Sequence, residues 1–195
     1  MSVKGLTIGF AVTGSYCTLT ETMPYIEALI NDGANVIPIM SDAVFQEDTK
    51  FGQAEYWRKA MEKITSNKII STIIEAEPIG PKKILDIMII APCTGNTLAK
   101  LANGITDTAV VMAAKAQLRN QKPIVVAIST NDGLSMNAKN LGILLNTRNI
   151  YLVPFGQDSP QTKTRSIVAH FPLIKTTILE ALQGRQIQPI LLQYK

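Results

Sequence analysis

Four short segments of the sequence carry the small polar groups that bind anions in proteins. They are Thr13-Gly14-Ser15, Ser41-Asp42, Ala91 to Thr97, and Ser129-Thr130-Asn131. Hydroxyls, amides and free N–H groups at helix starts suit a phosphate above other ligands. Glycine lets the backbone approach a ligand closely, and a serine can cap a helix while donating to an oxygen. We therefore predict that this chain binds a phosphate-bearing ligand.

A structural alternative exists for each of the single hydroxyls. Ser, Thr and Asn are common helix caps, so any one of these residues, taken alone, is better explained as a cap. The hydroxyls to which this applies are those of Ser15, Thr18, Thr94 and Thr97. The same chemistry at four separate places is harder to explain in this way, and the joint pattern favours a ligand.

The class of ligand is narrowed by two motifs that the sequence lacks. The segment after the first apolar run reads TGSYCTLT, which is not the G-x-G-x-x-G fingerprint, and no Walker A pattern is present. Nicotinamide dinucleotide or ATP bound in the usual way is therefore disfavoured. A mononucleotide such as FMN stays open, because its single phosphate needs one anion site and its ring a flat apolar cleft.

The elements that must position these groups are apolar strands alternating with amphipathic helices. We expect strands at 3–13, 35–40, 85–91, 123–129 and 150–155. We expect helices at 19–31, from about 51 to 65, 95–103, 106–120 and about 162–184. Residues 69–83 are ambiguous, with a loop marked by Pro78, Gly80 and Pro81. This order predicts an α/β fold, a three-layer αβα sandwich with a mostly parallel Rossmann/flavodoxin-like sheet. Ligands of such sheets bind at the carboxyl ends of the strands, and all four polar segments follow a predicted strand.

Composition and charge set the broad class of protein. The chain has 195 residues, 46% of them hydrophobic, and a net charge of +4. We expect a single domain over 1–195, with residues from about 185 to 195 as a tail. Basic residues are dispersed, which disfavours nucleic-acid binding. No apolar run approaches the ~20 residues of a membrane span, so a cytoplasmic protein is expected.

Two cysteines and one histidine limit the metal and redox chemistry. Cys17 and Cys93 fit reduced thiols better than a disulfide framework, and we expect both to be small buried groups. His170 is the single histidine, so we expect no metal site and a structural or exposed role for this residue. Tyr56 and Trp57 are expected to be buried in the core or in an interface.

Several motifs resemble those of a known family. APCTGNTLAKLANGITD (91–107) resembles the signature of the FMN-binding cysteine-decarboxylase-like flavoproteins. AVTGSYCTLTE and MSDAVFQ resemble that family's phosphate loop and the segment after its second strand, and VAISTNDGLSMNAKNL occupies the place of its Pro-Ala-Met-Asn segment. The resemblance spans most of residues 5–155 and implies that FMN is the cofactor.

The resemblance assigns roles to individual positions. It implies that four residues hold the flavin phosphate: Thr13, Gly14, Ser15 and Ser41. It implies that five more form the pocket for the ribityl chain and ring: Ala91, Pro92, Thr94, Asn96 and Thr97. Asn131 matches the family's substrate-contacting Asn, and Ser129 and Thr130 are further candidates for substrate contacts.

A narrower resemblance within this family concerns the substrate. TKFGQAEYW, EAEPIGPKK and RNIYLVPFGQDSP resemble one component of a two-component bacterial oxidoreductase. That resemblance implies oxidation of a dihydropyridine dicarboxylate to its aromatic form during sporulation. It also implies NADP on the partner protein, and the wider family implies a homo-oligomer.

The sequence departs from the family pattern at two points. The decarboxylases use a histidine near the middle of the chain, and here none lies between residues 48 and 86. The triplet before Asn131 reads IST instead of PAM. A small dicarboxylate needs hydrogen-bond donors, and Lys139 or Arg165 are candidates for charge, although a solvated role is the simpler one. Asp132 could act as a base, but Asp-Gly favours a turn.

Three functional hypotheses follow. The first is a redox protein that binds FMN and acts with its partner, with no catalytic residue assigned. The second is a binding module that keeps the phosphate site but has lost chemistry. The third is a stand-alone flavin-dependent decarboxylase, which the absent histidine disfavours.

Overall fold

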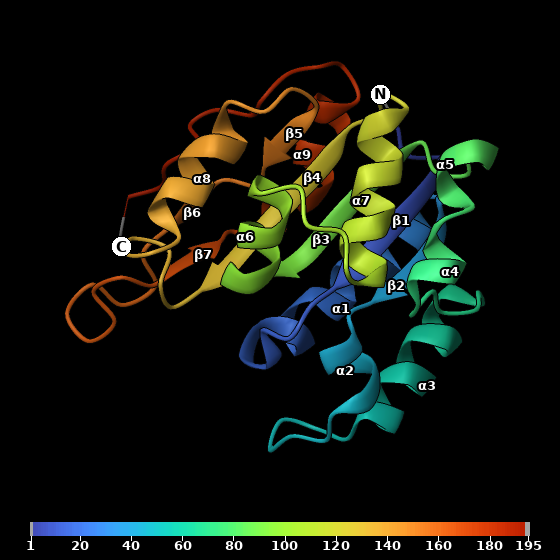
Figure 1. Ribbon diagram of the computed structural model, residues 1–195, viewed down its shortest axis with the longest axis horizontal. Coiled ribbons are helices and arrows are strands. Elements are labelled where there is room, and N and C mark those ends of the chain that lie inside the picture. The colour runs from blue at the N-terminus through green and yellow to red at the C-terminus, as the bar shows by residue number, and fades with distance from the viewer. Residues whose placement is uncertain (1, 194–195) are drawn as a thin grey trace.

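A sheet of parallel strands forms the centre of the computed structural model, which describes residues 2–193 (Figure 1). The five parallel strands are β1 (Thr7–Val12), β2 (Asn35–Met40), β3 (Ile87–Cys93), β4 (Ile124–Thr130) and β5 (Ile150–Leu152). Their order across the sheet is β2-β1-β3-β4-β5. β1, β3 and β4 are buried almost throughout, which explains why they are continuous apolar runs in the sequence. β2 lies on one side of β1 and β3 on the other, so the order of strands reverses between β1 and β3. Flavodoxin-like sheets bind their ligands at such a position.

A short antiparallel hairpin extends the sheet beyond β4. Its strands are β6 (Phe155–Gly156) and β7 (Ile167–Ala169). β5 pairs with the first half of β4, whereas β7 pairs with its last two residues, Ser129 and Thr130. The sheet is therefore a mixed one of seven strands, and two different partners follow each other along β4.

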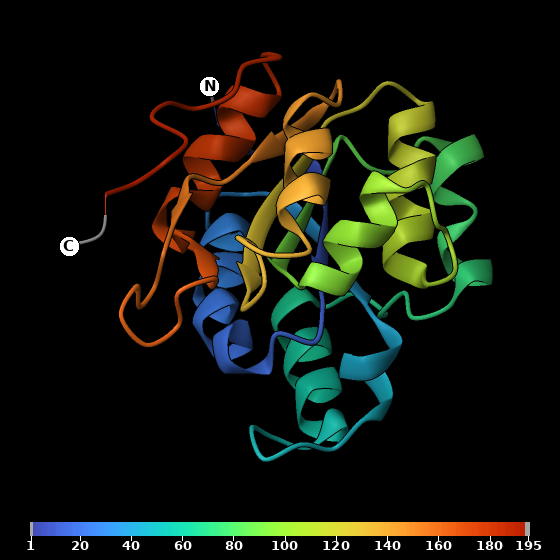
Figure 2. The ribbon, with the colours of Figure 1, turned by 60° about the vertical axis from the view of Figure 1, so that its left-hand side comes forward.

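Helices cover both faces of this sheet (Figures 1 and 2). One face carries α1 (Tyr16–Asn31) and α9 (Ile174–Ala181), with α3 (Ala54–Thr65) packed on α1 and β2. The other face carries α6 (Gly95–Ala102), α7 (Ala109–Arg119) and α8 (Ala138–Leu145). The shorter elements are α2 (Asp42–Gln46), α4 (Ile73–Ala76), α5 (Ile79–Lys82) and the 3-10 helix η1 (Phe171–Leu173). The predicted α/β sandwich with a mostly parallel sheet is confirmed.

The prediction of one helix over 162–184 is wrong. Residues 157–166 form a loop, 167–169 form β7, and α9 begins only at Ile174. The Ile-Val-Ala run of β7 is β-branched and apolar, and it finds a strand partner in β4. The pairing of β7 with β4 thus determines the structure of residues 167–169, although apolar residues at helical spacing follow them.

Smaller differences concern the ends of elements. α1 starts at Tyr16, three residues before the predicted start, and β3 continues through Pro92 to Cys93. The predicted strand at 150–155 is divided into β5 and β6. The ambiguous segment 69–83 contains α4 and α5, so the loop expected around Pro78 to Pro81 is a short helix instead, and α4 starts with a capping box between Thr72 and Glu75. α8 was not expected.

The expected tail packs against the body of the structure as far as it is described. Phe155 donates its N–H to the Ile190 carbonyl at 3.0 Å, and Leu192 donates to the Phe155 carbonyl at 2.9 Å. Residues 190–192 therefore lie along β6, Gln186 bonds to Leu152 of β5, and residues 194–195 of the expected tail lie outside the described residues. Within residues 2–193 no helix combines the length and apolar character needed to cross a bilayer.

Candidate functional site

A cavity of about 790 Å³ lies at the carboxyl ends of β1, β3 and β4. Seven of the residues that the resemblance assigned to phosphate, ring or substrate binding line it: Gly14, Ser15, Thr94, Asn96, Ser129, Thr130 and Asn131. They come from three segments that are far apart along the chain and meet because parallel strands end at one edge of the sheet. The volume lies within the range of small-molecule sites.

Three hydroxyls form a cluster at the start of α1. The Ser15 and Ser129 Oγ atoms are 2.8 Å apart, and Thr18 Oγ1 lies 3.0 Å from each of them. Ser15 stands at the N-cap of α1, but its side chain makes no cap hydrogen bond, and the first turn has no acidic residue. The N-terminal end of a 16-residue helix is thus left free of side-chain anions beside a group of hydroxyls. This arrangement is suited to an anion.

A second set of hydroxyls ties β1 to β3. Thr13 is buried, and its Oγ1 donates to the Pro92 carbonyl at 2.8 Å and accepts from the Thr94 N–H at 3.0 Å. Thr94 caps α6, since its Oγ1 accepts from the Thr97 N–H at 3.2 Å. Thr94 also donates to the Thr97 hydroxyl at 3.1 Å. These bonds fix the shape of the loop, and of these residues only Thr94 lines the cavity.

Ser41 has a hydroxyl with unused hydrogen-bonding capacity. Its N–H donates to the Val12 carbonyl at 3.1 Å, which joins the ends of β2 and β1. Its Oγ is buried and has no hydrogen-bond partner within residues 2–193. Ser41 and the fully buried Ala91 are not among the cavity-lining residues. The structure thus places both beside the strand ends but does not bring them into the cavity.

A chain of polar side chains supports the segment after β4. Asp132 accepts from the Thr130 hydroxyl at 2.6 Å and from the Asn137 amide at 2.7 Å. Asn137 in turn accepts from the Asn140 amide at 2.8 Å. A Cβ at Gly95 would lie 2.6 Å from polar atoms of Thr130, Asp132 and Asn137. The absence of a side chain at Gly95 therefore lets α6 approach this chain closely.

These contacts explain the role of Asp132 and reveal residues that the sequence analysis missed. Asp132 lies in a turn, as expected, and both of its carboxylate oxygens already accept hydrogen bonds. Asn137 and Asn140 are buried and were not predicted. The signal that could have found them is the density of Asn and Asp directly after a buried strand.

The loop between β6 and β7 supplies a further side of the cavity. Asp158, Lys163 and Ser166 line it, and Ser166 donates to the Thr130 carbonyl at 3.2 Å. Lys163 Nζ lies 3.0 Å from Asp158 Oδ2. This hydrogen bond raises the pKa of Lys163. Partial burial opposes ionisation of Asp158, but the neighbouring Ser166 hydroxyl and the Lys163 ammonium together lower its pKa. The expected helix at 162–184 concealed Lys163 and Ser166, and Asp158, which lies just before that range, was not singled out from the sequence.

The pattern that defines the Flavoprotein family matches residues 2–167. The chain belongs to the flavoprotein family. It is 49% identical over 192 residues to the B subunit of dipicolinate synthase from Bacillus subtilis (strain 168), and the aligned region covers 98% of this flavoprotein and 96% of the relative.

Solved structures agree with this membership. The crystal structure of the dipicolinate synthase B subunit from Bacillus halodurans is 48% identical, with a TM-score of 0.91 over 99% of both chains. DmrB from Burkholderia xenovorans, solved in complex with FMN, is 20% identical, with a TM-score of 0.67 over 91% of this flavoprotein and 96% of DmrB. The second likeness shows a shared fold.

The two cysteines of the flavoprotein differ from each other. Cys93 is fully buried in β3, as expected, and burial raises the pKa of its thiol. Cys17 is exposed and lines the cavity, so the expectation that it is buried is wrong. The reason is its position in the first turn of α1, which opens toward the cavity.

The remaining predicted residues lie away from the cavity. His170 was expected to be either structural or exposed, and it is exposed. Arg165 donates to the Ser135 hydroxyl at 3.0 Å. Trp57 is buried as predicted, whereas Tyr56 is 62% exposed, which contradicts its expected burial in the core. The two rings stand edge to face, with centroids 5.1 Å apart, because consecutive helical residues point in different directions.

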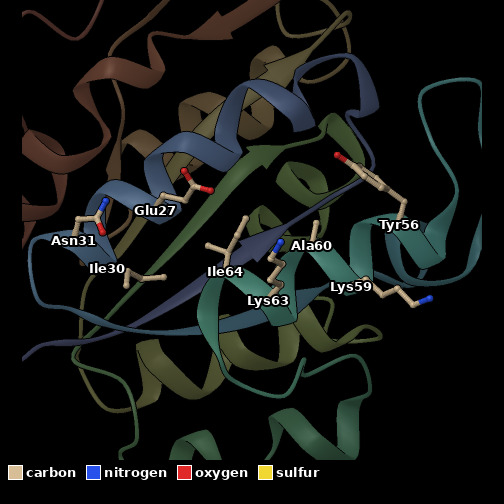
Figure 3. A pocket seen from close by; sticks show the side chains of 8 residues that line it. All are labelled: Glu27, Ile30, Asn31, Tyr56, Lys59, Ala60, Lys63 and Ile64. Atoms are coloured by element: carbon tan, nitrogen blue, oxygen red, sulfur yellow. The ribbon is translucent and has the colours of Figure 1, made fainter.

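A second hollow of about 730 Å³ lies between α1 and α3 of the flavoprotein (Figure 3). Figure 3 shows Glu27, Ile30 and Asn31 of α1 opposite residues of α3. The residues that line it from α3 are Tyr56, Lys59, Ala60, Lys63 and Ile64. None of the residues singled out for phosphate or substrate binding lines this hollow. Within residues 2–193, no group of three His, Cys, Asp or Glu residues is arranged to hold a metal ion.

Proposed function

We propose that this flavoprotein acts with a partner, the A subunit of dipicolinate synthase, in the oxidation of dihydrodipicolinate to dipicolinate in sporulating bacteria. The observation that carries this proposal is the 49% identity to the B subunit of that enzyme over 98% of the chain. The cavity at the ends of β1, β3 and β4 gives the proposal a site. NADP would be held by the partner protein.

The residues present fit the phosphate of FMN. Ser15, Thr18 and Ser129 supply a cluster of hydroxyls, and the free N-terminus of α1 supplies backbone N–H groups. Ser41 adds a buried hydroxyl without a partner among the described residues. We therefore propose that Thr13, Gly14, Ser15 and Ser41 form the phosphate side. Of these, Thr13 would act through its bonds to Pro92 and Thr94.

The other strand ends would form the ring and substrate side. Thr94 and Asn96 face the cavity, while Ala91, Pro92 and Thr97 hold the shape of the loop behind it. Thr130 and Asn131 would then orient the dicarboxylate, while Ser129, also expected as a substrate contact, would belong to the hydroxyl cluster on the phosphate side. FMN, when bound, would supply a two-electron redox centre at this place.

A binding module without redox chemistry is the second candidate. The specific observation that favours it is the position of His170, which is exposed and is not among the cavity-lining residues. In that case the hydride of the substrate would pass directly to the nicotinamide on the partner protein. The flavoprotein would then only hold a ligand and the partner.

The first experiment is the absorbance spectrum of the purified chain, alone and after FMN is added, followed by titration with the partner protein. A bound and reducible flavin, with dipicolinate formed only when both proteins are present, would support the redox role. A chain that takes up no FMN but still restores synthesis would support the binding module. If mixing the two proteins forms no dipicolinate, the proposed reaction is wrong.

We also propose a cytoplasmic homo-oligomer. The apolar side chains of Leu134 and Met136, 47% and 72% exposed, lie in the segment directly after β4, close to the site. Exposed apolar groups of this kind are common where a second chain packs. Light scattering of the purified chain measures the assembly state, and a mass of one chain at micromolar concentration would contradict the proposal.

A further inference from the structure

The cavity at the strand ends has an uneven set of charged groups. Among the described residues that line it, the acids are Glu21, Asp132 and Asp158, and the one cation is Lys163. Both carboxylate oxygens of Asp132 already accept hydrogen bonds from within the chain. A ligand with two carboxylates would therefore meet repulsion from three sides unless Lys163 compensates.

Lys163 lies where its ammonium group can pair either with Asp158 or with a ligand in the cavity. Its side chain is exposed in the loop between β6 and β7, and it lies 3.0 Å from Asp158 of the same loop. Exposed ion pairs of this kind stabilise a fold little, so one carboxylate can replace another at small cost. The hydrogen bond from Ser166 to the Thr130 carbonyl holds the base of this loop at the end of β4. The ammonium is thus kept beside the proposed substrate contacts.

We propose that Lys163 determines specificity for a dicarboxylate: it leaves Asp158 and pairs with one carboxylate of the ligand in the cavity. This inference rests on the proposed function, because it names the residue that recognises the substrate class in the same site. A charge-assisted hydrogen bond to a carboxylate is among the stronger polar contacts in proteins. Asp158 would hold the ammonium in place until the ligand arrives.

The test is calorimetric titration of the full chain with dipicolinate, with and without added FMN. Lys163→Met should weaken dipicolinate binding about tenfold or more, and should change binding of the monocarboxylate picolinate much less. Asp158→Asn should tighten dipicolinate binding a few-fold, because the competing carboxylate is gone. Lys115→Met, a change at an exposed position of α7, is the matched control and should leave both affinities unchanged.

The outcomes separate this inference from the proposed function. Equal affinity of Lys163→Met and the wild-type chain for dipicolinate overturns it. A loss of FMN affinity with unchanged dipicolinate affinity also overturns it, because Lys163 would then hold the phosphate. If the wild-type chain binds dipicolinate but no FMN, the cofactor assignment fails while the role of Lys163 is still measured. A wild-type chain that binds no dipicolinate overturns the role of Lys163, whereas the proposed function fails only if the two proteins together form no dipicolinate.

Discussion

Two hollows of similar volume, about 790 Å³ and about 730 Å³, lie on this molecule and are built in different ways. The first lies where β1, β3 and β4 end, and its walls come from loops that follow separate strands. The second lies between the surfaces of α1 and α3 (Figure 3). Its polar groups are the ends of long side chains such as Lys59 and Lys63.

The difference lies in how firmly the polar groups other than Lys163 are held. In the first hollow, Ser15, Ser129 and Thr130 are short side chains held by hydrogen bonds to one another or to neighbours. In the second, Lys59 pairs only with Glu55 on its own helix, within the described residues, and both side chains are largely exposed. Ordering a long side chain on a ligand costs conformational entropy, whereas a short side chain already in place loses little. Selective ligand binding is therefore expected in the first hollow and not in the second.

The largest expected effect is at Gly95 beside the first hollow, because neighbouring atoms leave no space for a side chain there. Gly95→Ala would place a Cβ 2.6 Å from three polar atoms, so either α6 or the Asp132 network must move. We expect the free energy of unfolding in urea to fall by about 1–3 kcal/mol, together with weaker FMN binding. Gly142→Ala in α8 meets open space and should be neutral or stabilising by up to about 1 kcal/mol. Equal behaviour of the two variants would contradict the close packing described here.

A smaller effect is expected at the hydroxyl cluster. Ser129→Ala removes a hydroxyl that bonds to both Ser15 and Thr18. FMN affinity should fall about five- to tenfold, corresponding to roughly 1 kcal/mol for one hydrogen bond. Thr20→Ala, at an exposed position of α1, is the control. Fluorescence titration of FMN measures both, and an unchanged affinity in Ser129→Ala would remove this cluster from the phosphate site.

The two cysteines test whether the first hollow is open and where a ligand lies. Cys17 lines the cavity and should react with a thiol reagent, whereas burial raises the pKa of Cys93 and keeps it protonated. The reagent should therefore modify the exposed Cys17 alone in the folded chain. FMN should slow the reaction of Cys17 several-fold. Mass spectrometry counts the modified thiols, and two fast-reacting thiols in the folded chain would be the contrary result.

The smallest effect is expected in the second hollow. Tyr56 is 62% exposed, so Tyr56→Ala should change the free energy of unfolding by less than about 0.5 kcal/mol. FMN and dipicolinate affinities should stay as in the wild-type chain. A clear loss of either affinity would mean that the two hollows are coupled and that the contrast drawn between them is wrong.

The sequence predicted the parallel part of the fold because its strands are buried on both faces. β1, β2, β3 and β4 are continuous apolar runs, and a polar segment follows each of them. That pattern located the cavity, since seven residues predicted from it line the cavity together. Local sequence is informative here because each strand end is a property of its own segment.

The parts that were missed depend on partners far along the chain. β7 is three residues long and is stabilised as a strand only by its pairing with the end of β4 and with β6. The Asp132 network requires Gly95 to bring α6 close, which no spacing within residues 131–140 reveals. Lys163 and Asp158 lie in a loop whose place over the cavity follows from that same pairing. Non-local contacts of this kind are invisible in hydrophobic periodicity.

β4 pairs with β5 along its first half and with β7 at its end. This division separates a part of the site that is fixed by the core from a part that can change during evolution. Ile124 to Val126 pair with β5 inside the parallel sheet, so their geometry is fixed by the core. The loop from 157 to 166 leaves and re-enters the sheet through the hairpin, and its length can vary with little cost in loop-closure free energy. Insertions or exchanges there would alter which ligand is accepted without disturbing the hydroxyl cluster at α1. In this architecture, a new substrate preference can arise while the phosphate-binding part of the site is inherited unchanged.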